Sequence, residues 1–556
     1  MTPFQPPPWT IGTGLTFKTS ASAVAGRNHR FSCPAKVSLG ARYAVSSLQP
    51  NDATRWRRQW DDASSMHFAI RDAHALLSDG MTAKDAAAAT SRKLTAAQRR
   101  FLVHALHQLS DLSDTATDDA EVGLSLEANV EYSGSWGEIT VFGAHLVSDD
   151  GTVRELVRLR LKDVRSADDP EVGEFVAVAG WVLAKGIHPR HASVEPTRIR
   201  ITEFSLDTGR YLVHFDGTPK QARENYLSRG GPVQQALEDQ TLRPGSGCAD
   251  CNFLNVCPAV PNVRGALGLP GRSVATRALT ATDLGTYDRC PTAFHVLRRD
   301  HLPPAPPEEA DAYGHEARDR GIAVHTWLSW AHDRDPHHAC TADDLPDPII
   351  ERDSAITAAS RSRLSIEAYT IAWPYLQHHV GLCLLGFEGL DGWVTEPVHV
   401  LYDTDADIVV VSSPDLTCRM EATAALWRET KTSTVLPADV ESALHRYPAF
   451  ALNVSLLAAG VDDNMTAAGS AELEVLTPTG GEVFYVPLSD GTLVSTAQKI
   501  VARIGHAFSQ DKVFGPRPSA ACHSCDAYGW CLPKDVPDGP APTIDDAEFA
   551  ELPDPF

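Results

Sequence analysis

The chain has 556 residues, of which 43% are apolar. This length is more than one hydrophobic core usually supports, and it predicts a globular protein of two or more domains. The net charge of −23 argues against a protein that coats DNA through its overall electrostatic field. No apolar run is long enough to span a bilayer, and the first residues do not resemble a secretory signal. The sequence therefore predicts a cytoplasmic protein with no membrane segment.

Near the start of the chain stands a Cys-Pro pair, Cys33 and Pro34. Residues 81–110 show helical periodicity and predict two helices that serve mainly as scaffold. The longest apolar run, residues 175–184, predicts a buried strand.

Eight of the eleven cysteines form two sets with the same spacing. In each set a lone cysteine precedes a proline, and a Cys-x2-Cys-x5-Cys triplet follows more than two hundred residues later. The sets are Cys33, Cys248, Cys251 and Cys257, and Cys290, Cys522, Cys525 and Cys531. The recurrence indicates that a whole unit has been copied once. Four thiolates so placed favour an iron–sulfur cluster in each unit, with structural zinc as the alternative.

The remaining cysteines, Cys340, Cys383 and Cys418, show no spacing pattern and are expected to be plain thiols. Proline and glycine interrupt any periodicity between the two cysteine sets, which predicts a linker there. We therefore expect a first unit over residues 1–262, a linker over 263–277, a second unit over 278–534, and an acidic, disordered tail over 535–556.

The second unit presents chemically distinctive residues in a particular order. His325 lies on a predicted amphipathic helix, Asp415 near the end of an apolar strand, Glu429 and Lys431 on the next strand, and Tyr447 on the following helix. Strand alternation places Glu429 and Lys431 on one face. Singly, these residues are commonly core, turn or surface groups. Together, two carboxylates and an imidazole can hold a hard divalent cation, and the lysine can orient a water molecule.

This order of residues inside the cysteine frame resembles the PD-(D/E)XK nuclease superfamily. The resemblance is to its iron–sulfur branch of RecB-like nucleases, found in CRISPR adaptation and in the AddB nuclease domain. It covers roughly residues 275–535. It implies a restriction-endonuclease-like α/β fold, with a mixed sheet flanked by helices and closed by a four-cysteine cluster of the 4Fe–4S type.

The resemblance also implies roles for the residues of the second unit. His325, Asp415 and Glu429 match the family's ligands for Mg²⁺ or Mn²⁺, and Glu429-Thr430-Lys431 matches its ExK motif. The family's next helix carries Gln-x-x-x-Tyr. Tyr447 matches the tyrosine, but Ala443 stands where the glutamine would be.

The same comparison makes the first unit a degenerate copy. Glu127 falls near the position of Glu396. The alignment places His145 at the position of Asp415, Arg160 at that of Glu429, and Lys162 at that of Lys431. Both metal carboxylates would then be lost.

Arg158, Arg160 and Lys162 alternate along one face of the predicted strand. Such a face suits contact with nucleic-acid phosphate. The alternative is that these are surface charges paired with Glu155 or Asp163.

The sequence thus predicts two tandem PD-(D/E)XK-like domains, the second a metal-dependent DNA nuclease acting in repair, recombination or defence against phage or plasmid DNA. The first is expected to bind DNA or to act as scaffold. The rival is a non-catalytic iron–sulfur protein that binds DNA or supports assembly. The chain has no phosphate-loop motif, so a helicase or other ATPase partner would be a separate chain.

Overall fold

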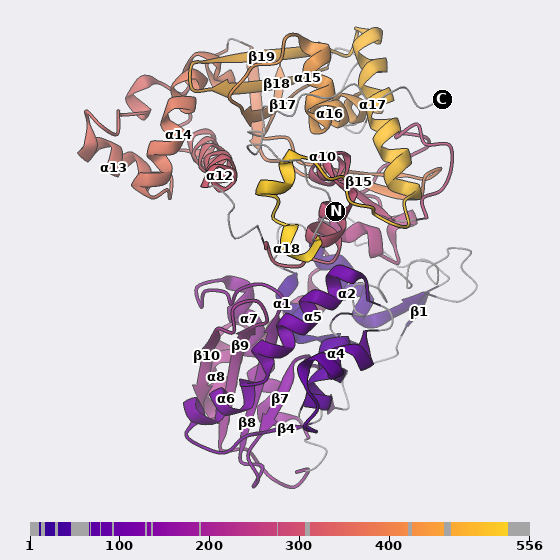
Figure 1. Cartoon of the computed structure of the whole chain (residues 1–556), viewed down its shortest axis with the longest axis vertical. Coiled ribbons are helices and arrows are strands. Elements are labelled where there is room, and N and C mark those ends of the chain that lie inside the picture. The colour runs from indigo at the N-terminus through magenta and orange to yellow at the C-terminus, as the bar shows by residue number, and fades with distance from the viewer. Residues whose placement is uncertain are drawn as a thin grey trace. The chain divides into compact units, whose positions relative to one another are not determined.

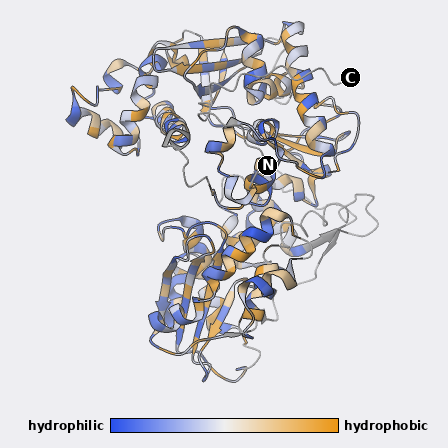
Figure 2. Ribbon diagram, in the orientation of Figure 1, coloured by the Kyte–Doolittle hydropathy of each residue, from blue (hydrophilic) through white to orange (hydrophobic). Residues whose placement is uncertain are grey.

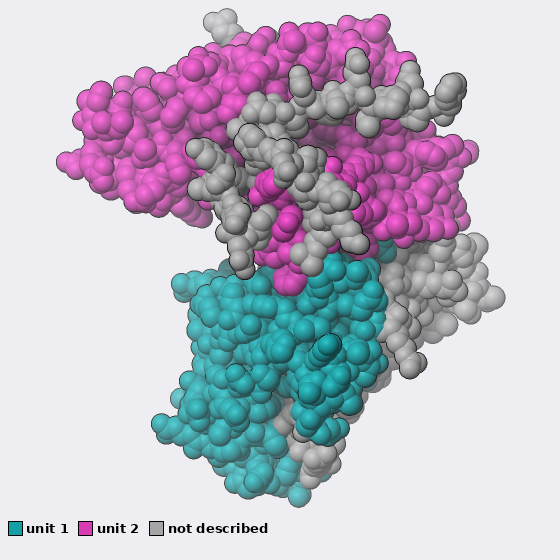
Figure 3. Space-filling model, viewed as in Figure 1, with its two compact units in different colours: residues 1–259, 296–303 teal, residues 260–295, 304–556 magenta. Residues whose placement is uncertain are grey.

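The structure is a computed structural model of the 556-residue chain. It describes residues 10–12, 17–27, 32–45, 66, 68–77, 79–91, 94–127, 131–134, 137–187, 191–274, 276–305, 312–387, 389–420, 425–460 and 469–531. The chain divides into two compact units, shown in separate colours in Figure 3. Unit 1 comprises residues 1–259 and 296–303, and unit 2 comprises residues 260–295 and 304–556.

A five-stranded mixed sheet forms the centre of unit 1. Its strands are β4 (Ser125–Glu127), β7 (Ala144–Val147), β8 (Val153–Arg160), β9 (Arg198–Ser205) and β10 (Tyr211–Gly217). They lie in the order β10-β9-β8-β7-β4. Strands β8 and β9 are parallel, and the other neighbouring pairs are antiparallel.

Two smaller sheets and a set of helices complete the described part of unit 1. The sheets contain β1 (Thr10–Gly12) with β3 (Tyr43–Val45), and β2 (Phe17–Ser20), β6 (Gly137–Thr140) and β5 (Glu131–Gly134). The helices are α1 (Ala21–Gly26), α2 (Pro34–Arg42), α4 (Ala83–Thr90), α5 (Ala96–Leu109), α6 (Leu112–Ala120), α7 (Pro170–Lys185), α8 (Pro219–Ser228) and α9 (Pro232–Glu238). Helices α4 and α5 confirm the two helices predicted within residues 81–110.

Helix α7 corrects the buried strand expected over residues 175–184. The side chain of Asp169 accepts a hydrogen bond from the backbone N–H of Glu171, and Pro170 occupies the first turn. Both features favour the start of a helix. For an apolar run of this length, periodicity alone cannot distinguish a buried strand from a buried helix. The cap before the run was the signal that distinguishes them.

A second five-stranded mixed sheet forms the centre of unit 2. Its strands are β13 (Leu390–Thr395), β16 (Leu416–Met420), β17 (Ala425–Thr432), β18 (Ser470–Thr477) and β19 (Gly480–Pro487), in the order β13-β16-β17-β18-β19. Strands β17 and β18 are parallel, and the other neighbouring pairs are antiparallel. A further sheet has the order β11-β14-β15-β12, from β11 (Asn262–Val263), β12 (Ala278–Thr280), β14 (His399–Asp403) and β15 (Ile408–Ser412).

Helices cover both faces of the large sheet in unit 2. The described helices of unit 2 are α10 (Ala281–Arg289), α11 (Pro291–Phe294), α12 (Ala312–Asp333), α13 (Arg352–Arg361), α14 (Ile366–His379), α15 (Val440–Arg446), α16 (Pro448–Ala458), α17 (Gly491–Gln510) and α18 (Tyr528–Cys531). Figure 1 shows α15, α16 and α17 on one side of β17–β19, and α12 and α14 on the other.

The core of unit 2 lies between the large sheet and α16 and α17. Trp427 and Leu473 from the sheet pack with Phe450 of α16 and Ile504 of α17. Helix α17 alternates apolar and polar residues in Figure 2, and its apolar side faces this core. This packing holds β17, one of the two strands of the hairpin that carries the candidate site.

The two large sheets share one topology. Following the chain, each begins with two antiparallel pairings, continues with a parallel pairing, and ends with an antiparallel one. The parallel strands are connected by α7 in unit 1, and by α15 and α16 in unit 2. Each unit therefore has the mixed sheet flanked by helices that the sequence predicted.

Residues 263–277, expected to be a linker, are largely part of unit 2. The backbone N–H groups of Gly265 and Leu267 donate to the Asp403 carboxylate at 3.2 and 2.8 Å. Leu267 and Leu269 lie in the core of unit 2. The glycines and prolines here shape a packed connection. The tail expected over 535–556 lies outside the described residues, and none of the described helices is long and apolar enough to cross a membrane.

Candidate active site

The central hairpin of the large sheet in unit 2 brings the two predicted acids together. Asp415 directly precedes β16, and Glu429 lies in β17. Leu416 pairs with Arg428, so Asp415 lies opposite Glu429 one step further along the ladder. The backbone N–H of Thr430 donates to Asp415 Oδ2 at 2.7 Å. This hydrogen bond holds the Asp415 carboxylate at the end of the hairpin.

Helix α12 places His325 beside Asp415. The imidazole Nδ1 lies 2.8 Å from Asp415 Oδ1. Burial alone would lower the pKa of His325, but the Asp415 carboxylate outweighs it and the pKa is raised. Burial alone would raise the pKa of Asp415, but the His325 imidazole and the Lys431 ammonium outweigh burial, so the pKa of Asp415 is lowered. The pair thus favours an imidazolium beside a carboxylate.

Glu429 is the more deeply buried of the two acids, with 7% exposure. Its Oε1 accepts from Lys431 Nζ at 2.5 Å, and its Oε2 accepts from the Asn453 side-chain amide of α16 at 3.4 Å. The Asn453 oxygen accepts in turn from the Ser412 hydroxyl at 2.5 Å. Burial raises the pKa of Glu429, although Lys431 opposes the shift. The sequence did not single out Asn453, although it lies on the same predicted helix as Tyr447.

Tyr447 lies between α15 and α16, not within one continuous helix as predicted. Pro448 begins α16, and the residue before a proline avoids the helical conformation. Burial alone would lower the pKa of Lys431, but neighbouring groups raise it. Glu429 contributes most to this rise, and Tyr447 is close enough to contribute as well. Ala443, at the position of the family's glutamine, is fully buried in the core of unit 2.

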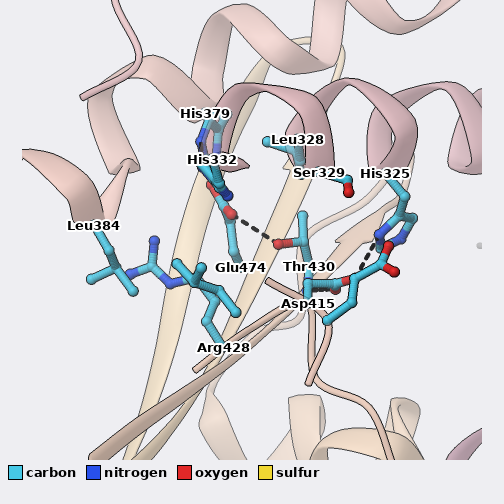
Figure 4. A pocket seen from close by; sticks show the side chains of 12 residues that line it. His325, Leu328, Ser329, His332, His379, Leu384, Asp415, Arg428, Thr430 and Glu474 are labelled. Atoms are coloured by element: carbon cyan, nitrogen blue, oxygen red, sulfur yellow. Dashed lines mark hydrogen bonds and ion pairs between the residues drawn. The ribbon is translucent and has the colours of Figure 1, made fainter. Parts of the chain in front are cut away.

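A pocket opens beside this group (Figure 4). It is lined by His325, Leu328, Ser329, His332, His379, Leu384, Glu396, Asp415, Leu416, Arg428, Thr430 and Glu474. Figure 4 shows His325 and Asp415 joined in one part of the pocket, and His332, His379 and Glu474 gathered in another. The pocket therefore joins the predicted site to a second polar group that sequence reasoning missed.

The donor set at the hairpin fits a divalent cation such as Mg²⁺ or Mn²⁺. Asp415 and Glu429 supply carboxylate oxygens, and His325 supplies an imidazole nitrogen. The carboxylates that raise the pKa values of His325 and Lys431 would also attract a bound cation, toward which His325 would act as a ligand in its neutral form. These three side chains are therefore suitable metal ligands, with Lys431 as an additional fixed cation.

Thiols of each predicted cysteine quartet lie near enough within their own unit to influence one another's pKa. In unit 2, the pKa of Cys525 is raised to about 11, first by burial and then by the other three thiols of its quartet. In unit 1, burial raises the pKa of Cys251 to about 12 and that of Cys248 to about 11, with thiols of the same quartet adding to both. A quartet of neighbouring thiols has the chemistry to hold an iron–sulfur cluster or a zinc ion.

The corresponding hairpin of unit 1 has different residues. Glu127 pairs with His145 across β4 and β7. In unit 2, the backbone N–H of Glu396 donates to the carbonyl oxygen of Asp415 at 2.9 Å. The two pairs match, so the strand ladders agree with the alignment of His145 with Asp415.

The ladders do not agree with the alignment of Arg160 with Glu429. His145 pairs with Leu156 in β8, so Leu156 occupies the place that Glu429 has in unit 2. The β7–β8 hairpin is shorter than the β16–β17 hairpin, and the sequence alignment did not allow for this. Leu156 is fully buried in the core of unit 1.

Arg158 and Arg160 do not form an open basic face. Arg158 lies 3.3 Å from Glu171 and 3.5 Å from Glu203, and Arg160 lies 3.9 Å from Glu203. The two arginine side chains are only 15% and 22% exposed. Strand β8 ends at Arg160, so the exposed Lys162 lies beyond the strand. Burial and acidic partners turn this predicted phosphate-binding face into an internal ion-pair cluster.

Glu155, one of the partners considered for these arginines, pairs instead with Arg200 of β9 at 2.9 Å. In unit 2, Arg428 of β17 pairs with Glu472 of β18 at 2.8 Å. Both are buried ion pairs between neighbouring residues of the central parallel strands. The acid lies on the first strand in unit 1 and on the second strand in unit 2.

Comparison with known families identifies the domain that contains these residues. Residues 278–532 match the family model described as the PD-(D/E)XK nuclease superfamily. The C-terminal half of the chain therefore contains a PD-(D/E)XK nuclease superfamily domain, a class whose members are generally nucleases. No curated protein matches the chain.

Proposed function

We propose that the C-terminal domain is a divalent-metal-dependent deoxyribonuclease. The observation that carries this proposal is the partly buried group of His325, Asp415, Glu429 and Lys431 at the central hairpin. The superfamily match supports phosphodiester hydrolysis as the reaction and DNA as the substrate.

The residues of the site have separable roles in this proposal. His325, Asp415 and Glu429 would hold Mg²⁺ or Mn²⁺, which when bound stabilises charge on phosphate and acidifies water. The Lys431 ammonium orients the attacking water and stabilises the negative charge that develops on the phosphoryl oxygens. The Thr430 N–H fixes Asp415, and the Asn453 amide fixes Glu429, at 2.7 and 3.4 Å.

We further propose that each cysteine quartet binds a 4Fe–4S cluster and that unit 1 is an inactive copy serving as scaffold. The shared topology of the two sheets supports duplication. The convergence of the quartets supports clusters that tie the two ends of each unit together. Any motor that supplies DNA to the nuclease would be a separate chain.

Cleavage by the full chain tests the nuclease proposal. We expect Mn²⁺ to support cleavage of single-stranded or duplex DNA, and a chelator to stop it. Glu429→Gln should abolish cleavage because a metal ligand is lost. Glu441→Gln, which alters an exposed acid in α15, is the matched control and should cleave normally. Full activity in Glu429→Gln, or no cleavage by the wild type with any DNA, would favour the non-catalytic alternative.

Iron and sulfide content tests the cluster proposal. Anaerobically purified protein should contain enough of both for two clusters. Cys522→Ser should lower the iron content, whereas Cys418→Ser, which alters a buried cysteine outside both quartets, should not. Colourless protein that lacks sulfide would contradict the proposal.

A further inference from the structure

Four buried side chains of unit 2 converge outside the candidate active site. They are His332 in the last turn of α12, Cys340 in the following loop, His379 at the end of α14, and Cys383 shortly after it. Each offers one donor atom, and all four donor atoms lie within 4.8 Å of one another. Two imidazoles and two thiols form a ligand set typical of zinc.

The separations of the donor atoms match a tetrahedral zinc site. Zn–N bonds of about 2.05 Å and Zn–S bonds of about 2.3 Å separate two nitrogens by about 3.3 Å, and a nitrogen from a sulfur by about 3.6 Å. His332 Nε2 lies 3.3 Å from His379 Nε2 and 3.8 Å from Cys383 Sγ. The side chains are thus close to zinc-binding positions.

Surrounding groups orient these donors. His379 Nδ1 lies 2.7 Å from Glu474 Oε1, so Nδ1–H donates to the carboxylate and Nε2 directs its lone pair toward His332. A carboxylate that accepts from the outer nitrogen of a histidine is the usual partner of a metal-bound imidazole. The backbone N–H of Cys340 donates to Cys383 Sγ at 3.4 Å, which stabilises a thiolate.

The surroundings of the cluster indicate a structural metal. Cys340 and Cys383 belong to a hydrophobic cluster that includes Trp327, Tyr369 and Leu376. Placing so many polar atoms in such a core is costly unless their hydrogen-bonding or ligand capacity is used. Four protein ligands complete a tetrahedral zinc site and leave no open position for substrate.

We propose that His332, Cys340, His379 and Cys383 bind a structural Zn²⁺ that fastens α12 and α14 to the catalytic sheet. His332 follows His325 by two helical turns on α12, about 10 Å along the axis. On the other side, Glu474 Oε2 accepts from the Thr430 hydroxyl at 3.1 Å, and the Thr430 N–H holds Asp415 (Figure 4). The zinc site would therefore position both members of the His325–Asp415 pair. This positioning role rests on the proposed nuclease function, whereas zinc binding does not.

Zinc and iron content of the full chain tests the assignment. Wild-type protein purified without chelators should contain zinc. Cys340→Ser and Cys383→Ser should each lose about one equivalent of zinc relative to wild type while keeping their iron, because each removes one of four ligands. Cys418→Ser is the matched control and should keep both metals. Wild-type protein without zinc, unchanged zinc in the two variants, or a Cys340–Cys383 disulfide found by alkylation would overturn the proposal.

Cobalt replacement provides a test that needs no ligand substitution. Wild-type protein prepared with Co²⁺ should show the intense visible bands of tetrahedral cobalt and thiolate-to-cobalt charge transfer. Glu474→Gln should keep this spectrum but release the metal about 10–100-fold more readily, as loss of a carboxylate partner does. The charge-transfer bands should be lost in Cys383→Ser, and a cobalt protein with octahedral bands alone, or with charge transfer unchanged in Cys383→Ser, would overturn the assignment. Zinc without DNA cleavage would refute only the nuclease proposal, and cleavage without zinc would refute only this one.

Discussion

The two large sheets share a topology but place different charges at the same hairpin. In unit 2, Asp415 and Glu429 lie at the hairpin beside His325 and Lys431. In unit 1, Leu156 occupies the place of Glu429, and nearby arginines pair with acids of their own. Arginine cannot ligate a cation. The strand order thus positions a hairpin in each unit, and the residues on it determine whether their chemistry suits a metal ion.

The strongest test of this contrast compares matched cations in the two units. Arg158 follows Leu156 by two residues in β8, as Lys431 follows Glu429 in β17. We expect Lys431→Met to lower single-turnover DNA cleavage by about 10²–10³-fold, because a fixed charge that stabilises the transition state is lost. Arg158→Met should leave the cleavage rate of folded protein unchanged. An equal loss in Arg158→Met would show that unit 1 takes part in the chemistry.

The reversed ion pairs give the next largest effect. Arg428→Met leaves Glu472 buried without its ion-pair partner, and Arg200→Met removes the ion-pair partner of Glu155 and of the more exposed Asp119 and Asp216. Each variant should lower the free energy of unfolding of its own unit by about 3 kcal/mol. Urea unfolding followed by hydrogen exchange separates the two units.

The charge-reversed double variant Arg428→Glu with Glu472→Arg serves as the control for this prediction. It should recover part of the lost stability, because the pair is restored. A single variant as stable as wild type would show that the ion pair is not a stability determinant.

The stability of unit 1 should decrease at low pH, because one of its partly buried ion pairs is lost when Glu171 is protonated. Burial raises the pKa of Glu171, but Arg165 and Arg158 lower it to about 2 from an ordinary value of 4.5. The folded pKa lies below the unfolded one, so this stabilisation is complete above about pH 4.5 and is lost as the pH falls toward 2. Hydrogen exchange in β8 and α7 should therefore accelerate over this range. Glu171→Gln should weaken that acceleration, and an identical pH profile in this variant would contradict the prediction.

Helix caps at matching places should give the smallest effect. Ser20 caps α1 and Thr280 caps α10, with hydrogen bonds of 3.1 and 3.0 Å from the third residue of each helix. Replacing either by Ala should cost about 1 kcal/mol. Thr280→Ala should cost more, because Asp283 completes a reciprocal capping box there. Thermal unfolding measures both, and a larger loss in Ser20→Ala would reverse the expected order.

Much of the fold and the main site could be predicted because their signals are local or repeated. The order of His325, Asp415 and Glu429 follows the order of the elements that carry them, and cysteine spacing recurs in both halves. The Leu156 position could not be predicted, because it depends on hairpin length, which only the strand pairing reveals. Cys340 and Cys383 were expected to be plain thiols because they show no spacing pattern. Their histidine partners come from separate helices and share no compact motif with them, so the sequence did not reveal the cluster.

The opposite orientation of the buried ion pairs has a consequence for folding specificity. A chain with two sheets of one topology risks pairing a strand of one half with a strand of the other. If β17 paired with β9 in the native register, Arg428 would meet Arg200. If β8 paired with β18, Glu155 would meet Glu472. Such like-charge contacts cost several kcal/mol. Each half therefore carries a charge order that accepts its own partner strand and rejects the equivalent strand of the other half.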